Sequence, residues 1–342
     1  MIINRILPLL LLFGLIAAPD AAFAAASEAA LLWWTRVLPS LLPYLIAASL
    51  LGRSDLFFRV PKRFQPFFLL LFGALGGYPV GAKLSARLCT LNVLSPGEAK
   101  KACACCNLPN PVFIISVVAI GFFADPRTAG PLLIGIYVPA LFGLIPLSKL
   151  TYGDTAAPPA SGANLSDAIG DGVRSIAAIL GCLVLASVLG ALLEAAGLFR
   201  AIAALLNLPE TTVGAVSTGL FEMTCGVRKI ALAAMPLQAR LALSAFFLQL
   251  GGAAVLLQTA SAFPISYVRY LLVKLLYAIC SAAIALALTP LFCPDTAVPT
   301  LASGAVMLRH TFDLASVLLA SGFGLLLVFL FTFGLSKRKN GA

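Results

Sequence analysis

The stretch that decides the fold lies in the first half of the chain and reads GGYPVGAK, from Gly76 to Lys83. Its three glycines and one proline interrupt an apolar run at about 64–88, and both residue types stop a helix from continuing. The second half holds a similar interruption, GLFEMTCG from Gly219 to Gly226, within an apolar run at about 212–236. Irregular backbone at membrane depth is tolerated only where it is buried in protein or lines a cavity. The two broken runs therefore predict two re-entrant helical hairpins.

The composition places these runs in a membrane. Hydrophobic residues make up 61% of the 342 residues and charged residues 11%, whereas a soluble domain carries about 25% charged residues. Apolar segments near the length of about 20 residues that spans a bilayer lie at approximately 33–51, 103–123, 129–150, 174–196, 240–261, 268–291 and 312–335. With one more helix at the N-terminus, they predict an all-α membrane protein of about eight transmembrane helices plus the two hairpins.

The N-terminal segment, residues 1–28, has two interpretations. Arg5, the apolar run after it and the small residues around Phe23 have the layout of a cleavable signal peptide. The other interpretation is a retained first transmembrane helix, which we expect, with both termini in the cytoplasm of a bacterial cell. The resulting topology puts Lys274 and most of the 23 basic residues on the cytoplasmic side, as the positive-inside rule requires. The exceptions are Arg36, Arg127, Arg200, Arg228, Lys229, Arg240 and Arg309.

An internal repeat organises the chain. Each half contains a helix, a broken hairpin, a helix interrupted by Gly or Pro, and an intact helix. The interruptions are NLPNP, from Asn107 to Pro111, and QLGG, from Gln249 to Gly252. We expect a first repeat at 29–150, a cytoplasmic linker at 151–172, a second repeat at 173–292, and an outer loop, final helix and basic tail at 293–342. Each unit crosses three times, so the second enters from the opposite face and the repeat is inverted. Inverted repeats with paired breaks are typical of secondary transporters.

The breaks supply the candidate substrate site. Half-helix ends leave backbone N–H and C=O groups unpaired, and N-terminal ends favour anions. The predicted substrate-binding residues lie at or beside the breaks: Gly76, Gly77, Pro79, Gly81, Lys83, Asn107, Asn110, Glu222, Thr224, Gln249 and Gly251. Two alternatives stay open for several of them. The glycines either admit a ligand or allow tight packing, and Lys83 either attracts a carboxylate or extends to the membrane surface.

Glu222 is the strongest single candidate, because a carboxylate within a membrane is costly and is a functional hypothesis by default. It is either a proton-coupling group, if burial keeps it protonated, or one half of an ion pair with Arg228 or Lys229. An ionised Glu222 would not bind an anion directly, so its predicted role is coupling or orientation.

Other function classes lack their motifs. The only histidine, His310, excludes an HExxH zinc site, and Ala82 stands where a phosphate-binding loop needs the Lys of its Gly-Lys pair. Basic residues form no patch typical of nucleic-acid binding. The sequence thus predicts neither an enzyme nor a protein with a cofactor or metal. Its expected partners are a small anionic solute and membrane lipid, and a non-transporting membrane scaffold is the alternative.

Two strings of the first half are similar to a known family. GYPVGAK, from Gly77 to Lys83, and NLPNP, from Asn107 to Pro111, resemble the sporulation integral membrane proteins of the nucleoside-recognition (Gate) domain family. The resemblance covers roughly residues 30–290 and is weaker in the second half, through G-x-x-E-x-T-x-G from Gly219 to Gly226. This chain has Gln249–Gly252 where the family usually shows a GFGG-like stretch.

The resemblance implies a function and a place in the cell. It implies transport of a small organic anion across the outer forespore membrane during sporulation, with dipicolinic acid as the leading substrate. More distant relatives handle nucleosides, which is the alternative substrate class. A homo-oligomer and sporulation membrane partners are further expectations.

Overall fold

The computed structural model describes residues 3–54, 56–149 and 164–294. Within these ranges every regular element is a helix, which confirms the all-α membrane class. Five of the described helices are long and apolar enough to span a membrane: Pro19–Arg53, Pro126–Ser148, Leu165–Ala195, Leu237–Ala262 and Val268–Phe292. A shorter apolar helix covers Phe113–Phe122. The helix predicted at 312–335 lies outside the described residues.

The N-terminal region differs from the prediction. After α1 (Ile3–Ala17), the elements α2 (Pro19–Leu32), η1 (Trp33–Val37) and α3 (Leu38–Arg53) form one continuous helical run. We predicted a helix only from residue 33, with a boundary at residue 28 that falls inside this run. Residues 19–32 are rich in alanine, the best helix former, and begin with Pro19 at the first helical position and Asp20 in the first turn. Local propensity therefore extends the helix towards the N-terminus.

The first half contains both predicted breaks. Its elements are α4 (Leu56–Arg59), η2 (Lys62–Phe64), α5 (Gln65–Gly76), α6 (Val80–Thr90), α7 (Pro96–Cys106), η3 (Phe113–Phe122), η4 (Pro126–Thr128), α8 (Ala129–Leu141) and α9 (Leu144–Ser148). Residues 77–79 separate the arms of the first hairpin, α5 and α6. The second break, at 107–110, follows α7, which starts with a Ser95/Glu98 capping box.

The second half repeats this order. Its elements are α10 (Leu165–Ala195), α11 (Leu198–Leu206), α12 (Glu210–Phe221), α13 (Met223–Leu232), α14 (Leu237–Leu250), α15 (Gly252–Ala262) and α16 (Tyr267–Phe292). Helix α10 begins inside the linker predicted at 151–172, because Asn164 caps it by accepting the Ser166 N–H at 2.9 Å. Its 31 residues extend about 46 Å, more than the roughly 30 Å of a hydrocarbon core.

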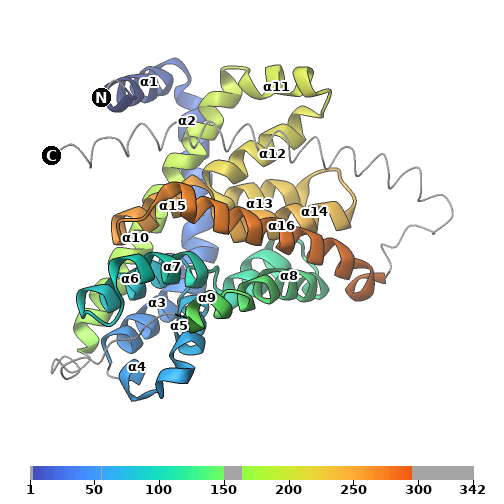
Figure 1. Cartoon of the computed structure of the whole chain (residues 1–342). Coiled ribbons are helices and arrows are strands. Elements are labelled where there is room, and N and C mark those ends of the chain that lie inside the picture. The colour runs from blue at the N-terminus through green and yellow to red at the C-terminus, as the bar shows by residue number, and fades with distance from the viewer. Residues whose placement is uncertain (1–2, 55, 150–163, 295–342) are drawn as a thin grey trace.

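Contacts between the halves come in matching pairs. Helix α6 of the first hairpin packs on α15, and α13 of the second hairpin packs on η3. Likewise α8 packs on α14 while α7 packs on α16. The run α2–η1–α3 lies along α10, so the first helix of each half also pairs with the other (Figure 1). Such reciprocity is what a two-fold relation between the halves would give, and the inverted repeat stays a prediction.

Charged side chains gather at the two ends of α10. Asp171, near its N-terminal end, pairs with Arg53 and Arg174, each at 2.6 Å. Near its C-terminal end, Glu194 lies 3.6 Å from Lys229. Arg53 and Arg174 were expected on one side of the membrane and Lys229 on the other, which agrees with this separation.

Lys274 lies inside the protein. We predicted it on the cytoplasmic side of the membrane, which stays a prediction, but its side chain is fully buried within the helix packing and does not reach a surface. Contacts inside the protein, and not the membrane surface, therefore stabilise this lysine.

Candidate functional site

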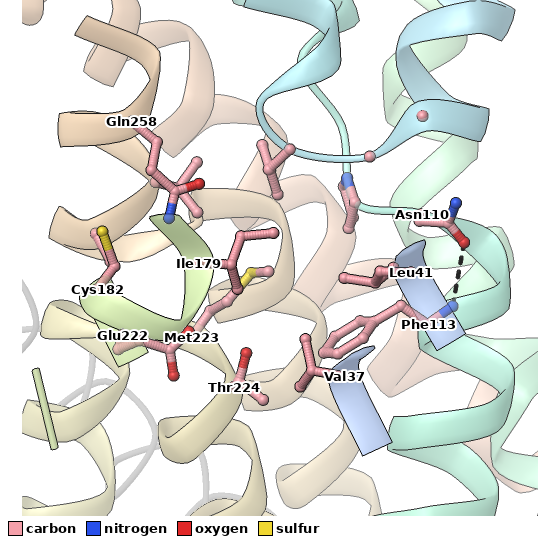
Figure 2. A pocket seen from close by; sticks show the side chains of 16 residues that line it. Val37, Leu41, Asn110, Phe113, Ile179, Cys182, Glu222, Met223, Thr224 and Gln258 are labelled. Atoms are coloured by element: carbon pink, nitrogen blue, oxygen red, sulfur yellow. Dashed lines mark hydrogen bonds between the residues drawn. The ribbon is translucent and has the colours of Figure 1, made fainter. Parts of the chain in front are cut away.

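A small cavity lies where the breaks of both halves meet, with a volume of about 40 Å³. The first half contributes residues of the hairpin turn and of the interrupted helix, and the second half contributes the corresponding positions. The lining consists of Val37, Leu41, Gly76, Gly77, Tyr78, Pro109, Asn110, Phe113, Ile179, Cys182, Glu222, Met223, Thr224, Ala254, Val255 and Gln258. Figure 2 shows Glu222 and Thr224 on one side, and Asn110 and Phe113 on the other.

The lining is mostly apolar with a few polar groups, as in pockets that bind small molecules. The polar side chains are Tyr78, Asn110, Glu222, Thr224 and Gln258, and no basic side chain lines the cavity in the part of the chain that the structure describes. A cavity of this size holds a few water molecules, whereas ligand pockets reach about 300 Å³ or more. The elements around the cavity must therefore move apart to admit a solute.

Glu222 joins the two arms of the second hairpin. It is 5% exposed, and its carboxylate accepts the backbone N–H of Cys225 at 2.8 Å, which caps α13. A carboxylate is favourable there because the N-terminal end of a helix carries partial positive charge. Arg228 pairs with Glu28 and Lys229 with Glu194. The predicted ion pair between Glu222 and one of these basic residues is therefore wrong.

Tyr78 at the first hairpin turn connects the two halves. Its hydroxyl donates to the backbone carbonyls of Gln249 at 2.9 Å and Leu248 at 3.2 Å, at the C-terminal end of α14. The peptide bond between Tyr78 and Pro79 is cis, and Gly77 has a positive φ of 72° that favours glycine. Tyr78 lies within GGYPVGAK, and its sequence pattern alone predicted no role for it.

The glycines of the first hairpin allow close packing. A Cβ atom on Gly81 would lie 2.4 Å from the carbonyl oxygen of Cys106, and one on Gly73 would lie 1.9 Å from the same atom. The second hairpin uses the same device, because a Cβ on Gly226 would lie 2.2 Å from the Cα of Gly219. For Gly81, the structure favours the packing alternative over ligand approach. Gly76 and Gly77 line the cavity.

Asn110 caps both sides of a break. Its Oδ1 accepts the N–H groups of Val112 at 2.7 Å and Phe113 at 3.2 Å, and its Nδ2 donates to the carbonyl of Leu75. The side chain thus ends α5 and begins the helix that contains η3. Because both polar atoms of the Asn110 amide already bond to backbone groups, a solute would touch this side chain as part of the cavity wall rather than form a hydrogen bond with it.

Asn107 lies behind the cavity and is fully buried. Its Nδ2 donates to the Thr259 hydroxyl at 2.8 Å and the Tyr270 hydroxyl at 2.9 Å, while its Oδ1 has no hydrogen-bond partner among the described residues. Gln249 is also fully buried, and neither polar atom of its amide has a hydrogen-bond partner among the residues that the structure describes. These unpaired atoms lie beside the breaks of α7 and α14.

The remaining predicted residues lie outside the cavity lining. Lys83 is exposed and donates to the Ser175 hydroxyl at 2.6 Å, which ties α6 to α10. Pro79 precedes α6, and Gly251, with a φ of 83°, forms the turn between α14 and α15. These residues shape the breaks, and their contact with a solute stays a prediction.

Lys274 of α16 is the functional candidate that sequence reasoning missed. Its ammonium donates to the backbone carbonyl of Asn107 and to the Tyr78 hydroxyl, the latter at 3.4 Å. It lies seven residues inside a 26-residue apolar helix, about 10 Å from the start of that helix. An ionisable residue at such a position is a functional hypothesis by default, and this was the available signal.

A second cavity of about 300 Å³ lies on the other side of the first turns of α13. Glu28, Arg228, Glu194 and Lys229 line it together with Cys225. Because Thr224 lines the first cavity and Cys225 the second, the start of α13 separates the two. The second cavity is lined by four charged side chains, whereas Glu222 is the one acidic or basic side chain among the described residues that line the first.

A comparison with known proteins gives one curated relative. Over 298 residues the chain is 28% identical to Sporulation integral membrane protein YlbJ of Bacillus subtilis (strain 168), with 74% of this chain and 73% of the relative covered. The chain is similar to a sporulation integral membrane protein. No family model matches it, and no solved structure matches it. The relative's name and the apolar helices support the membrane and sporulation parts of the expected resemblance, while the Gate domain and the substrate stay predictions.

Proposed function

We propose that this protein is a secondary transporter that moves a small organic anion by alternating access, with dipicolinic acid during sporulation as the first substrate to test. The observation that carries the proposal is the cavity lined by the breaks of both halves. Broken helices that meet at one site are typical of transporters, because the breaks offer backbone groups to a solute. The similarity to a sporulation integral membrane protein supports the biological setting.

Helix ends support an anionic solute. The helices η3, α13 and α15 begin at the cavity, and Phe113, Met223 and Ala254 from their first turns line it. N-terminal helix ends carry partial positive charge and favour anions. The C-terminal ends of α5, α7 and α14 are instead capped by Asn110, Lys274 and Tyr78. Backbone acceptors at these ends are thus paired within the protein. Of the three N-terminal ends, Asn110 caps the helix that contains η3 and Glu222 caps α13, whereas α15 has no side-chain cap and keeps its N–H groups for a solute.

Glu222 is proposed to orient the solute. Its carboxyl group lines the cavity and caps α13. In the protonated state it would donate a hydrogen bond to a solute carboxylate, and in the ionised state it would repel one. Binding of an anion beside Glu222 therefore requires the protonated carboxyl.

The two ends of α10 are proposed to close the pathway alternately. The Arg53–Asp171 pair and the Lys83–Ser175 hydrogen bond join α3, α6 and α10 at one end. The Glu28–Arg228 and Glu194–Lys229 pairs join α2, α10 and α13 at the other. Exposed ion pairs contribute about 0–1 kcal/mol each, so such contacts can break and form during transport. This function requires no enzymatic step and no cofactor.

Uptake by purified protein in liposomes tests the proposal. Labelled dipicolinate is compared with a labelled nucleoside, for the wild-type chain, Glu222→Ala and the control Glu210→Ala. Glu210 is partly exposed at the start of α12 and pairs with Arg200. We expect dipicolinate uptake that falls about tenfold or more in Glu222→Ala, since a hydrogen bond to a charged group contributes about 1.5–3 kcal/mol. The Glu210→Ala control should transport normally.

Other results would revise the proposal. Nucleoside uptake without dipicolinate uptake would keep the transport mechanism and reject the anion. If correctly folded protein moves neither solute, the transporter proposal fails and a membrane scaffold becomes the better account.

A further inference from the structure

Lys274 is a buried cation without a carboxylate partner. Its side chain has no measurable exposure, and no ion pair involves it among the described residues. Burying an ammonium in a low-dielectric interior without a counter-charge is costly, and such groups commonly lose their proton instead. A protein that keeps a lysine here has a group that can exist in two charge states at one fixed place.

The neighbours of Lys274 offer dipoles and aromatic faces. The helices packed on α16 include α7, α8 and α14. The titratable groups that interact with the ammonium are thiols and phenols: Cys103, Cys105, Cys106, Tyr78 and Tyr270. The ammonium lies 5.1 Å from the ring centroid of Tyr78 and 5.8 Å from that of Tyr270, within cation–π range.

Titratable groups on the other helix faces are engaged elsewhere. Helix α8 carries Tyr137, which donates to the Pro109 carbonyl at 2.6 Å, and α14 carries Arg240, which donates to the Ala231 carbonyl. On α16 itself, Tyr277 lies beside Cys105. None of these helices presents a carboxylate to Lys274.

The ammonium occupies the position at which a half-helix C-terminus attracts a cation. It donates to the carbonyl of Asn107, the residue that follows the end of α7. Half-helix C-terminal ends and unwound carbonyls are the groups that coordinate a coupling ion in transporters with broken helices. Here a side chain of the protein supplies the positive charge.

A short polar connection links this ammonium to the cavity and to the other half. Tyr78 contacts Lys274 through its hydroxyl, lines the cavity, and donates the same hydroxyl to Gln249 of α14. Asn107 Oδ1 and the Gln249 amide, beside the same two breaks, are buried and unpaired in the described structure. Lys274 therefore lies at the junction of both breaks and contacts Tyr78, a residue of the cavity lining.

We propose that Lys274 is the coupling residue of the transporter: its ammonium takes the place of a coupling metal cation, and it exchanges a proton with the cavity through the Tyr78 hydroxyl. The inference rests on the proposed transport function and adds the coupling ion. The protonated amine holds the end of α7 and increases the positive potential near the cavity, which favours an anion. Release of the proton from Nζ weakens the interaction between Lys274 and the end of α7. Proton and anion therefore bind together and move in the same direction.

Two substitutions separate a proton carrier from a fixed structural cation. Lys274→Arg keeps a charge that cannot be lost, and Lys274→Gln removes the charge and keeps hydrogen bonds. The variants are reconstituted with a pH-sensitive dye in the vesicle lumen, and labelled dipicolinate is added with or without a pH gradient. Lys101→Gln, exposed on α7, is the matched control.

Wild-type protein is expected to acidify the lumen as dipicolinate enters and to accumulate it along a proton gradient without sodium. Lys274→Gln should still equilibrate dipicolinate across the membrane. It should no longer acidify the lumen, and its gradient-driven accumulation of dipicolinate should fall at least tenfold. Lys274→Arg should lose net uptake. Glu222→Ala should take up dipicolinate more slowly, with the same protons moved per solute, and Lys101→Gln should match the wild type.

Several results would overturn the inference. Proton-driven accumulation that persists in Lys274→Gln or Lys274→Arg contradicts it, as does wild-type uptake driven by a sodium gradient but not by a proton gradient. In these cases the transport function itself stands, whereas wild-type vesicles without any uptake remove that function and this inference together. Tyr78→Phe gives a second test if both lysine variants misfold, because it keeps Lys274. It should slow proton movement more than downhill uptake of dipicolinate. Equal slowing of both would contradict proton exchange through the Tyr78 hydroxyl.

Discussion

The two hairpin turns differ in the origin of the charged side chain that contacts each of them. The second turn carries its own charge, Glu222, whose carboxylate caps α13 and lines the cavity. The first turn, at 77–79, carries no charge and receives a cation from the other half, because Lys274 of α16 contacts Tyr78. The second break thus places the Glu222 carboxyl group at the cavity. The first break contacts the Lys274 amine through the Tyr78 hydroxyl. The difference suggests that binding and coupling are divided between the two halves.

What the hairpins share is close backbone packing, and its disruption should give the largest effect. Gly81→Ala places a Cβ 2.4 Å from a carbonyl oxygen of α7, and Gly226→Ala places one 2.2 Å from the Cα of Gly219. Because backbone must shift in both cases, we expect each to destabilise the fold by about 1–3 kcal/mol or more. Thermal unfolding in detergent measures this, with Gly97→Ala as the control, since no atom lies within 4 Å of that Cβ. Equal stability of Gly81→Ala and the control would contradict the packing role.

The charged turn should be the more sensitive to loss of its side chain. Glu222→Ala removes the cap of α13, which costs about 0.5–2 kcal/mol, whereas Glu222→Gln keeps an acceptor and should cost less. Thermal unfolding of the two variants beside uptake separates stability from function. If Glu222→Gln loses as much stability as Glu222→Ala, then charge rather than capping holds this turn.

The uncharged turn depends on a hydroxyl. Tyr78→Phe removes the one hydroxyl donor that Leu248 and Gln249 share, and one such hydrogen bond contributes about 0.5–1.5 kcal/mol net. We expect a loss within that range in thermal unfolding. Tyr44→Phe, at a residue 38% exposed, should change nothing. An unchanged melting temperature for Tyr78→Phe would show that the link between the halves lies elsewhere.

The smallest effect is expected at Lys83, which follows the first turn but lies outside the cavity lining. Lys83→Ala removes one hydrogen bond to Ser175. Because Lys83 is exposed and water screens its charge, the loss should cost no more than about 1 kcal/mol. The KM for the transported solute should stay within about threefold of the wild-type value, a free-energy change below 1 kcal/mol. A KM raised tenfold or more would instead favour the alternative in which Lys83 attracts the solute.

Much of the fold was predictable because membrane helices leave a simple signal. The breaks at Gly77 and Gly251 were visible as glycine in apolar runs, and the structure interrupts helices at both. The start of α10 was missed because Asp, Gly and Ser between residues 165 and 172 read as a linker. Only the cap at Asn164 and packing against α3 make that segment helical.

The site was less predictable, because long-range pairing decides which polar residue faces the cavity. Glu222, Thr224 and Asn110 line it as their place at the breaks suggested, while Asn107 and Gln249, equally close to breaks in sequence, are buried behind it. Lys274 was assigned to the membrane surface because charge counting treats every lysine near a helix end alike. Its partners, Tyr78 and the Asn107 carbonyl, lie 196 and 167 residues away in sequence.

The central claim is that one solute site lies at the joined breaks and opens to each side of the membrane in turn. Cys182 lines the cavity, so a chain that retains only this cysteine and still takes up solute allows a direct measurement. A membrane-impermeant maleimide is applied to either face of sealed vesicles, with and without dipicolinate. We predict that Cys182 reacts from both faces and that dipicolinate slows the reaction from both. Labelling from one face only, or labelling that no transported solute slows, would contradict the account.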